Sequence, residues 1–90
     1  MTHYESHWDL RLHPQCARTL KSLERADLRR IDKALLELAR DPLAGDNHLL
    51  HGVYNIRRKR VGDWRIIFKV ETVARLVLVL DIVRRSSTTY

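Results

Sequence analysis

The chain has little cysteine, glycine and proline, and it has no long hydrophobic run. Its one cysteine, Cys16, can form no intrachain disulfide and excludes a cysteine-based zinc site, and three glycines and two prolines leave no long flexible linker. The longest apolar stretch, Leu76–Leu80, is far shorter than the roughly 20 residues of a membrane-spanning helix. The opening MTHYESHWDL has no apolar run typical of a signal peptide. We therefore expect a single domain over residues 1–90 in a reducing, cytoplasmic setting.

Acidic residues are scarce in the second half of the sequence. Residues 1–45 carry eight Lys and Arg against seven Asp and Glu, whereas residues 46–90 carry nine against four, a net charge of +5. Such asymmetry predicts a polyanionic partner, which could be nucleic acid, an acidic protein segment or an anionic membrane. Arginine outnumbers lysine thirteen to four, which favours bidentate recognition of phosphate or carboxylate.

Hydrophobic periodicity predicts one strand, two helices and then three strands. Pro14 suits the first turn of a helix, Asp41-Pro42 ends an apolar stripe of helical spacing, and Val61-Gly62-Asp63 is a turn signal. The expected elements are a strand over Tyr4–Leu12, helices over Pro14–Ser22 and Ala26–Arg40, a loop over Leu43–Gly52, and strands over Val53–Arg60, Trp64–Val70 and Leu76–Val83. The order β-α-α-β-β-β predicts an α+β fold in which both helices pack on one face of a small, mainly antiparallel four-stranded sheet.

The expected hairpin, VYNIRRKRVGDWRII, carries five basic residues within nine positions. Side chains of a strand alternate between the two faces of a sheet. The helix-covered face is then expected to hold Tyr54, Ile56, Trp64, Ile66 and Phe68. The open face is expected to hold Asn55, Arg57, Lys59, Arg65, Ile67 and Lys69.

These cations could form an ordinary solvated face, since antiparallel sheets commonly expose charge on one side. However, cationic neighbours on adjacent strands repel each other unless an anion lies between them. The C-terminal segment RRSSTTY adds two arginines, hydroxyl groups and an aromatic ring, which are suited to holding a phosphate and an unstacked base. We therefore expect an RNA-binding site on the open face.

The element order and three stretches, LLHGVYNIR, RVGDWRIIFKV and DIVRRSSTTY, resemble the RelE/ParE superfamily of bacterial and archaeal toxins. The resemblance covers nearly the whole chain and is best over residues 49–90, where VGDWRIIF matches the family's Gly-Asp-aromatic-Arg turn into the third strand. RelE-type members of this superfamily are endoribonucleases that cleave mRNA in the ribosomal A site. ParE-type members poison DNA gyrase and generally lack the cluster of catalytic basic residues.

The resemblance to the ribonucleases implies four catalytic residues: Arg57, Arg65, Arg84 and Tyr90. The first two would clamp the scissile phosphate, Arg84 would stabilise charge, and Tyr90 would stack on a base or act as a general base. Asn55 stands where RelE has a lysine, so the basic set is incomplete, and His51 is a candidate replacement base. Further contacts to RNA or the ribosome are expected from Asn55, Arg58, Lys59, Arg60, Lys69 and Arg85.

The implied reaction is attack of an RNA 2′-hydroxyl on the adjacent phosphate, which leaves a 2′,3′-cyclic phosphate and a free 5′-hydroxyl. Neither a cofactor nor a metal is expected. The implied partners are a cognate antitoxin and mRNA on the ribosome with contacts to 16S rRNA. Operator DNA is expected only through the antitoxin complex, and no membrane contact is expected. Two alternatives stay open: gyrase inhibition of the ParE type, and a catalytically silent member that binds its antitoxin.

Overall fold

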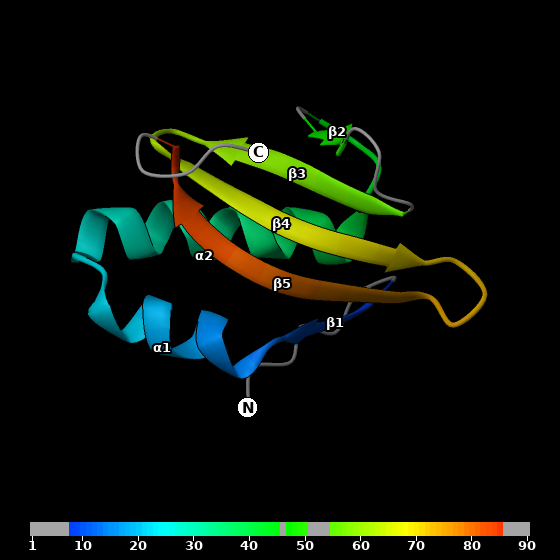
Figure 1. The fold of residues 1–90 in the computed structure, drawn as a ribbon, viewed down its shortest axis with the longest axis horizontal. Helices are drawn as coiled ribbons and strands as arrows, with labels where there is room; N and C mark the ends of the chain where they lie inside the picture. The colour runs from blue at the N-terminus through cyan, green and yellow to red at the C-terminus, as the bar shows by residue number, and fades with distance from the viewer. Residues whose placement is uncertain (1–7, 46, 51–54, 86–90) are drawn as a thin grey trace.

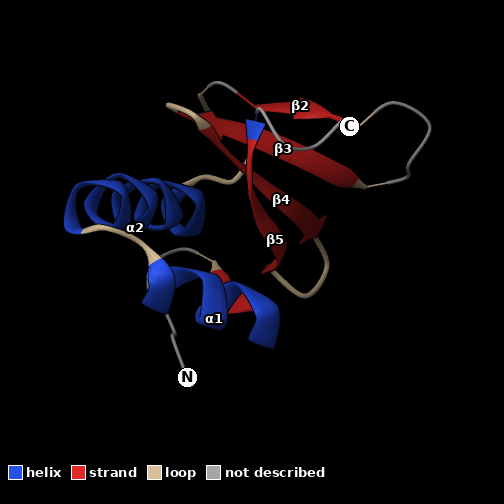
Figure 2. Cartoon of the chain, turned by 60° about the vertical axis from the view of Figure 1, so that its left-hand side comes forward, coloured by secondary structure: helices blue, strands red, loops and turns tan. Residues whose placement is uncertain are grey.

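The computed structural model describes residues 8–45, 47–50 and 55–85, and two helices lie on one side of a five-stranded sheet (Figures 1 and 2). The elements are β1 (Asp9–Leu12), α1 (Pro14–Ser22), α2 (Arg25–Arg40), β2 (Asn47–Leu49), β3 (Ile56–Val61), β4 (Trp64–Glu71) and β5 (Leu76–Arg84). The strand order is β1-β5-β4-β3-β2, and β1 pairs in parallel with β5 while the other pairs are antiparallel. The predicted α+β fold, with both helices on one face of the sheet, is confirmed. The sheet has five strands and not the predicted four, because the short strand β2 forms in the segment predicted to be a loop.

The helices begin and end where the sequence predicts, to within one residue. The His13 side chain accepts a hydrogen bond from the backbone N–H of Gln15 at 3.3 Å and so caps α1, whose first residue is Pro14. The helix α2 ends at Arg40 because the following residue, Asp41, precedes a proline and is extended. Neither helix, within the part of the chain that the structure describes, has the length and apolar character needed to cross a membrane.

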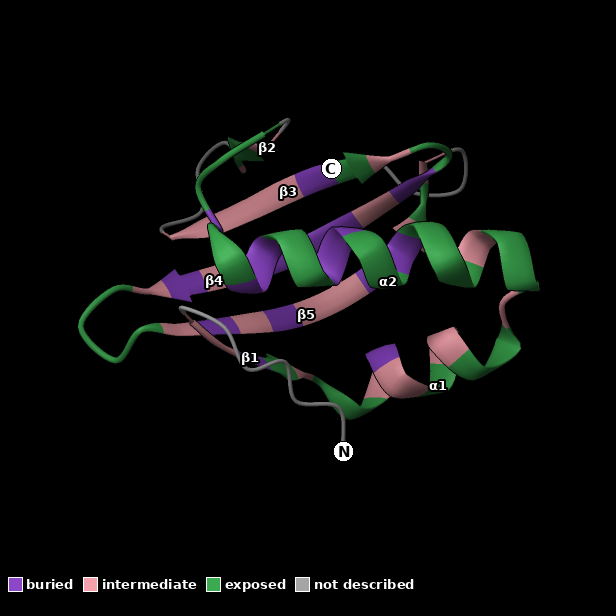
Figure 3. Ribbon diagram, turned by 180° about the vertical axis from the view of Figure 1, so that it is seen from behind, coloured by how far each residue is buried: buried purple, intermediate pink, exposed green. Residues whose placement is uncertain are grey.

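The core lies between α2 and the sheet, and buried and exposed residues alternate along α2 (Figure 3). The helix buries Ile31, Ala34, Leu35, Leu38 and Ala39. The sheet contributes Leu10, Trp64, Ile66, Phe68, Val70, Val77, Val79 and Ile82 to the same core. The predicted inward positions on β4 are therefore confirmed, and burial of side chains of this size contributes about 1.5–3 kcal/mol each.

The prediction for β3 was wrong by one residue. Arg57 lies opposite Phe68 and Lys59 lies opposite Ile66, so both basic residues are on the helix-covered face. Asn55 is in a turn with a left-handed φ of 60°, and β3 begins only at the next residue. The alternation therefore starts after this turn, and a shift of one residue exchanges the two faces of a strand. Tyr54 lies outside the described residues.

Lys59 and Arg57 contact groups on the helix side and at the sheet edge. Lys59 is 8% exposed, and its Nζ lies 3.6 Å from Oε1 of Glu37 on α2. Arg57 donates a hydrogen bond from Nη1 to Oδ1 of Asn47 at 2.7 Å. Neither side chain therefore projects from the open face.

A β-bulge in β5 changes which of its residues face the helices. Phe68 pairs with Val79 and Ile67 pairs with Asp81, so Leu80 is the extra residue of β5. Residues before the bulge and residues after it therefore follow opposite alternations.

Candidate anion-binding site

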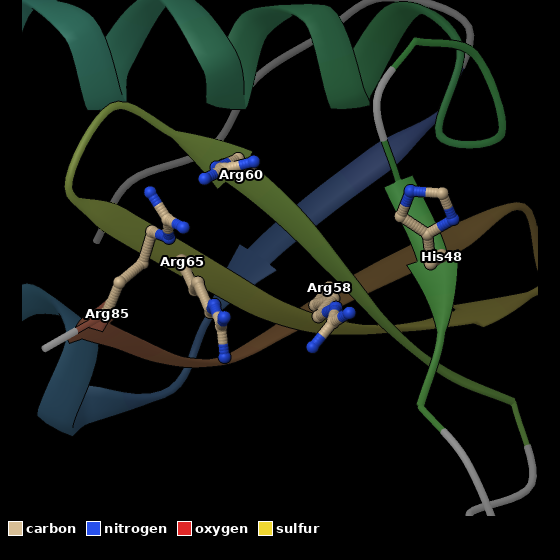
Figure 4. Close-up of a pocket in the computed structure, with 5 residues that line it drawn as sticks. All are labelled: His48, Arg58, Arg60, Arg65 and Arg85. Carbon is tan, nitrogen blue, oxygen red and sulfur yellow. The ribbon is translucent and has the colours of Figure 1, made fainter. Parts of the chain in front are cut away.

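Four arginines and one histidine line a pocket of about 120 Å³ on the open face of the sheet (Figure 4). The lining residues are His48 from β2, Arg58 and Arg60 from β3, Arg65 from β4, and Arg85 after β5. We call this the arginine pocket. Sites for drug-sized ligands are roughly 300–1,000 Å³, so a pocket of this size suits a single phosphate or carboxylate group.

The strand register brings the first four of these side chains together. Arg60 lies directly opposite Arg65, and His48 lies directly opposite Arg58. Arg58 and Arg60 are two positions apart on β3 and therefore share a face. Ile67, the partner of Arg58 on β4, is also on the open face and is only 5% exposed. The arginine pocket thus adjoins apolar sheet surface.

The fifth residue, Arg85, follows β5 and is held in place by hydrogen bonds to the hairpin turn between β3 and β4. The backbone N–H of Arg85 donates to the carbonyl of Asp63 at 2.8 Å, and its Nη1 donates to the carbonyl of Gly62 at 3.4 Å. Gly62 has a positive φ of 58°, a conformation that favours glycine in this turn. The turn therefore places Arg85 beside the arginines of β3 and β4.

Positive charge accumulates in the arginine pocket without a carboxylate among the described residues that line it. Desolvation, and then the charges of Arg58, Arg85 and Arg60, lower the pKa of the Arg65 guanidinium below its usual range. Because an arginine remains protonated at any working pH, these four guanidinium groups repel one another in the free protein. A bound anion would relieve this repulsion.

Arg84 lies on the other side of the sheet from the arginine pocket. After the bulge, Ile82 faces the core and Arg84 pairs with Trp64 on the helix-covered face. The Arg84 guanidinium carbon lies 4.8 Å from the centre of the Trp64 ring, a cation–π contact. The prediction that Arg84 reaches a phosphate site beside Arg65 is therefore not supported by its placement.

The remaining predicted site residues are dispersed. Asn55 lies in the turn before β3, and the Lys69 ammonium lies 3.2 Å from Oε1 of Glu71. His51 and Tyr90 lie outside the described residues. Of the predicted catalytic residues that the structure describes, Arg65 lines the arginine pocket and Arg57 and Arg84 do not. The other arginines of the pocket, Arg58, Arg60 and Arg85, were predicted only as RNA contacts.

His48 was not predicted as a site residue. Its only sequence signal is its position in the segment that precedes the basic strand, and that segment was predicted to be a loop. Pairing of β2 with β3 brings it to Arg58. Across the described ranges, no three His, Cys, Asp or Glu side chains are arranged to hold a metal ion.

Comparison with known protein families identifies the family to which the chain belongs. The model of the ParE toxins of type II toxin–antitoxin systems (parDE) matches residues 10–88. The chain belongs to the ParE toxin family. This match confirms the RelE/ParE superfamily indicated by the sequence. No curated protein sequence is significantly similar to the chain.

Solved toxin structures share the fold. The archaeal RelE–RelB complex from Pyrococcus horikoshii has a TM-score of 0.80 and 25% identity, covering 91% of this chain and 99% of that one. The intact RelBE toxin–antitoxin complex of E. coli has a TM-score of 0.73 and 15% identity, covering 92% and 96%. A YoeB/ParE toxin from Agrobacterium tumefaciens has a TM-score of 0.70 and 17% identity, covering 83% and 95%. The fold of the chain is therefore that of the RelE-like toxins.

Proposed function

We propose that this toxin is a ribosome-dependent endoribonuclease that cleaves mRNA at a phosphate held in the arginine pocket. The observation that carries the proposal is the convergence of Arg58, Arg60, Arg65 and Arg85 on a pocket sized for one anion. Guanidinium groups bind phosphate through paired N–H donors. Preorganised cations of this kind stabilise the charge that develops on phosphate oxygens in a transition state.

In the proposed reaction, the RNA 2′-oxygen forms a bond to phosphorus and the bond from phosphorus to the 5′-oxygen breaks. The products are a 2′,3′-cyclic phosphate and a 5′-hydroxyl, so one proton must leave the 2′-hydroxyl and one must reach the 5′-oxygen. Among the described residues of the pocket, His48 is the side chain whose type exchanges protons near neutral pH. We assign removal of the 2′-hydroxyl proton to His48, and the 5′-oxygen takes its proton from water. Stacking of Tyr90 on a base stays a prediction.

We also propose a cognate antitoxin as the protein partner. The Pyrococcus horikoshii relative was solved as a RelE–RelB complex and the E. coli relative as a toxin–antitoxin complex. Binding to operator DNA would then occur through the antitoxin, and the site of action would be the cytoplasm. The net charge of +6 is consistent with an acidic partner surface.

The test is cleavage of a defined mRNA on purified ribosomes programmed with it. Wild-type toxin should produce cuts with 2′,3′-cyclic phosphate and 5′-hydroxyl ends, and Arg58→Gln should reduce cleavage by about 100-fold. The matched control is Arg29→Gln, which removes the same charge from an exposed position of α2 and should keep full activity. Intact mRNA with the wild-type toxin would refute the proposal.

Gyrase inhibition is the second candidate function, and two observations favour it. The matching family is that of the ParE toxins, and Arg57 and Arg84 both lie on the helix-covered face, away from the arginine pocket. Expression of the toxin in cells separates the two functions. Double-strand DNA breaks with intact mRNA would indicate gyrase, whereas mRNA cuts within coding regions would indicate the ribonuclease.

A further inference from the structure

A second cationic hollow lies between the helix α2 and the strand β3. It has a volume of about 260 Å³, and its lining residues are Arg30, Lys33, Ala34, Glu37, Lys59, Arg60 and Val61. We call it the α2–β3 groove. It is larger than the arginine pocket, and one of its two walls comes from α2, a helix that the proposed chemistry does not use.

The groove carries four cations against one carboxylate, and that carboxylate already has a partner. Glu37 lies 3.6 Å from Lys59. Arg30, Lys33 and Arg60 are exposed, and they supply the remaining positive charge. Arg30 marks the end of the groove at the hairpin turn, where a Cβ built on Gly62 would lie 3.3 Å from its Nη1. The groove is therefore complementary to an acidic ligand.

Arg60 belongs to both hollows. It lines the arginine pocket with Arg65 and the α2–β3 groove with Arg30. Pairing of β2 with β3 ends at Lys59, so β2 does not cover Arg60 at the edge of the sheet. Figure 4 shows Arg60 as the member of the cluster nearest to α2. One exposed guanidinium can thus turn toward a ligand in either hollow.

We propose that the α2–β3 groove binds an acidic peptide segment whose carboxylate engages Arg60 and withdraws it from the arginine pocket. The peptide then weakens phosphate binding without having to cover the pocket. Because coupling between two binding sites is reciprocal, phosphate in the pocket weakens peptide binding by the same factor. The identity of the peptide as part of the antitoxin rests on the proposed function, whereas the chemistry of the groove does not.

A peptide fits this groove better than a nucleic acid backbone does. Ala34 is buried and Val61 is half-buried in the wall of the groove, so the groove offers apolar surface between its cations. The Glu37 side chain is 51% exposed, and a nucleic acid backbone, which carries a charge on every nucleotide, would bring a phosphate against it, whereas a peptide can place an uncharged residue there. A peptide can instead place acidic side chains on the arginines and an apolar side chain on Ala34 and Val61.

The first experiment measures binding of a fluorescent peptide rich in Glu and Leu to the full chain at low ionic strength. The double variant Arg30→Gln/Lys33→Gln should bind it roughly 2- to 30-fold more weakly, since two exposed charge pairs are lost. The matched control, Arg25→Gln/Arg29→Gln, removes the same charge from the same helix and should bind as wild type. Equal losses in both double variants, or no loss in either, would overturn the groove as the binding site.

The second experiment measures the coupling. The phosphate probe is a short fluorescent RNA whose 2′-hydroxyls are methylated, so it cannot be cleaved. Saturating peptide should lower the affinity of wild-type toxin for this RNA about fivefold or more. The same ratio should be close to one in Arg60→Gln and should stay at the wild-type value in Arg58→Gln, which lines the arginine pocket but not the groove.

The result in Arg60→Gln separates withdrawal of Arg60 from simple charge neutralisation. If peptide weakens RNA binding equally in wild type and in Arg60→Gln, the shared arginine is not the cause and the inference is wrong. If wild-type toxin leaves mRNA on ribosomes intact, the proposed function fails. The peptide measurements on the two double variants then still decide whether the groove binds an acidic segment.

Discussion

Lys59 and Arg58 are adjacent basic residues with different expected roles, one in stability and the other in RNA cleavage. Substituting each residue in turn distinguishes these two roles. Lys59 lies on the helix-covered face and its side chain is 10% exposed, whereas Arg58 lines the arginine pocket. Substitution of Lys59 should therefore change the free energy of unfolding and have little effect on RNA cleavage. Substitution of Arg58 should reduce RNA cleavage and have little effect on stability.

The size of the stability effect follows from the buried stem of Lys59. Lys59→Ala removes three methylene groups at about 0.8 kcal/mol each, and the ion pair with Glu37 adds at most about 1 kcal/mol because Glu37 is half exposed and can be hydrated. Relief from holding a buried ammonium offsets part of this loss. We expect a net loss of about 2 kcal/mol for Lys59→Ala. Lys59→Met keeps most of the stem, so it should fall within about 1 kcal/mol of wild type or exceed it.

The assay is thermal unfolding followed by circular dichroism, with cleavage of ribosome-bound mRNA measured on the same preparations. A change of 1 kcal/mol shifts Tm by roughly 4–8 °C in a domain of this size, so Lys59→Ala should melt roughly 8–16 °C lower than wild type. Arg58→Ala should melt within a few degrees of wild type. The reasoning would be refuted by the reverse pattern, in which Lys59→Ala melts normally and abolishes cleavage, because that result would place Lys59 in the RNA site.

Three further predictions concern the other charged and buried groups. Arg65→Gln should leave Tm unchanged or raise it, because desolvation, and then the neighbouring arginines, lower the pKa of this guanidinium and so disfavour its charge. The same variant should reduce cleavage by about 100-fold, and a large fall in Tm would show that Arg65 is structural. Arg84→Ala should cost about 0.5–1 kcal/mol of stability through loss of its contact with Trp64 and should keep most of the cleavage activity, which unfolding curves and the ribosome assay can check. Burial, and then the Asp81 carboxylate, raise the pKa of the Cys16 thiol from 9.0 to about 11. The unfolded thiol therefore loses its proton first, and stability relative to Cys16→Ala should fall by about 1.4 kcal/mol or less per unit between pH 9 and pH 11; equal slopes in urea titrations of the two proteins would contradict a shifted thiol.

The helices and β4 were predictable because their signals are local. Pro14 and Asp41-Pro42 mark helix boundaries through backbone sterics alone. Apolar side chains at alternate positions of β4 select the buried face with no knowledge of the neighbouring strands. Arg65 belongs to the same alternation, and it is therefore the predicted catalytic residue that the structure places in the arginine pocket.

The face of β3 was not predictable from its own alternation. Polar and basic residues occupy consecutive positions from Arg57 to Arg60, so no apolar pattern distinguishes the faces. The turn at Asn55 and the pairing of Lys59 with Ile66 decide which residues point outward. An inward lysine is acceptable here because Glu37 lies across from it on α2, a contact between residues 22 positions apart in the chain.

The sequence by itself determined the order of the two helices and of the four longer strands, the hairpin turn and the excess of arginine in the second half, because each of these depends on neighbouring residues or on composition. The short strand β2 has no such local signal, and it forms through its pairing with β3. Tertiary structure decided which arginines meet. A single extra residue in β5 moves Arg84 to the helix-covered face, and strand pairing brings His48 to Arg58. A strand has a period of two, so one bulge or one turn residue exchanges its faces, and that choice is made by pairing between strands rather than by any local pattern.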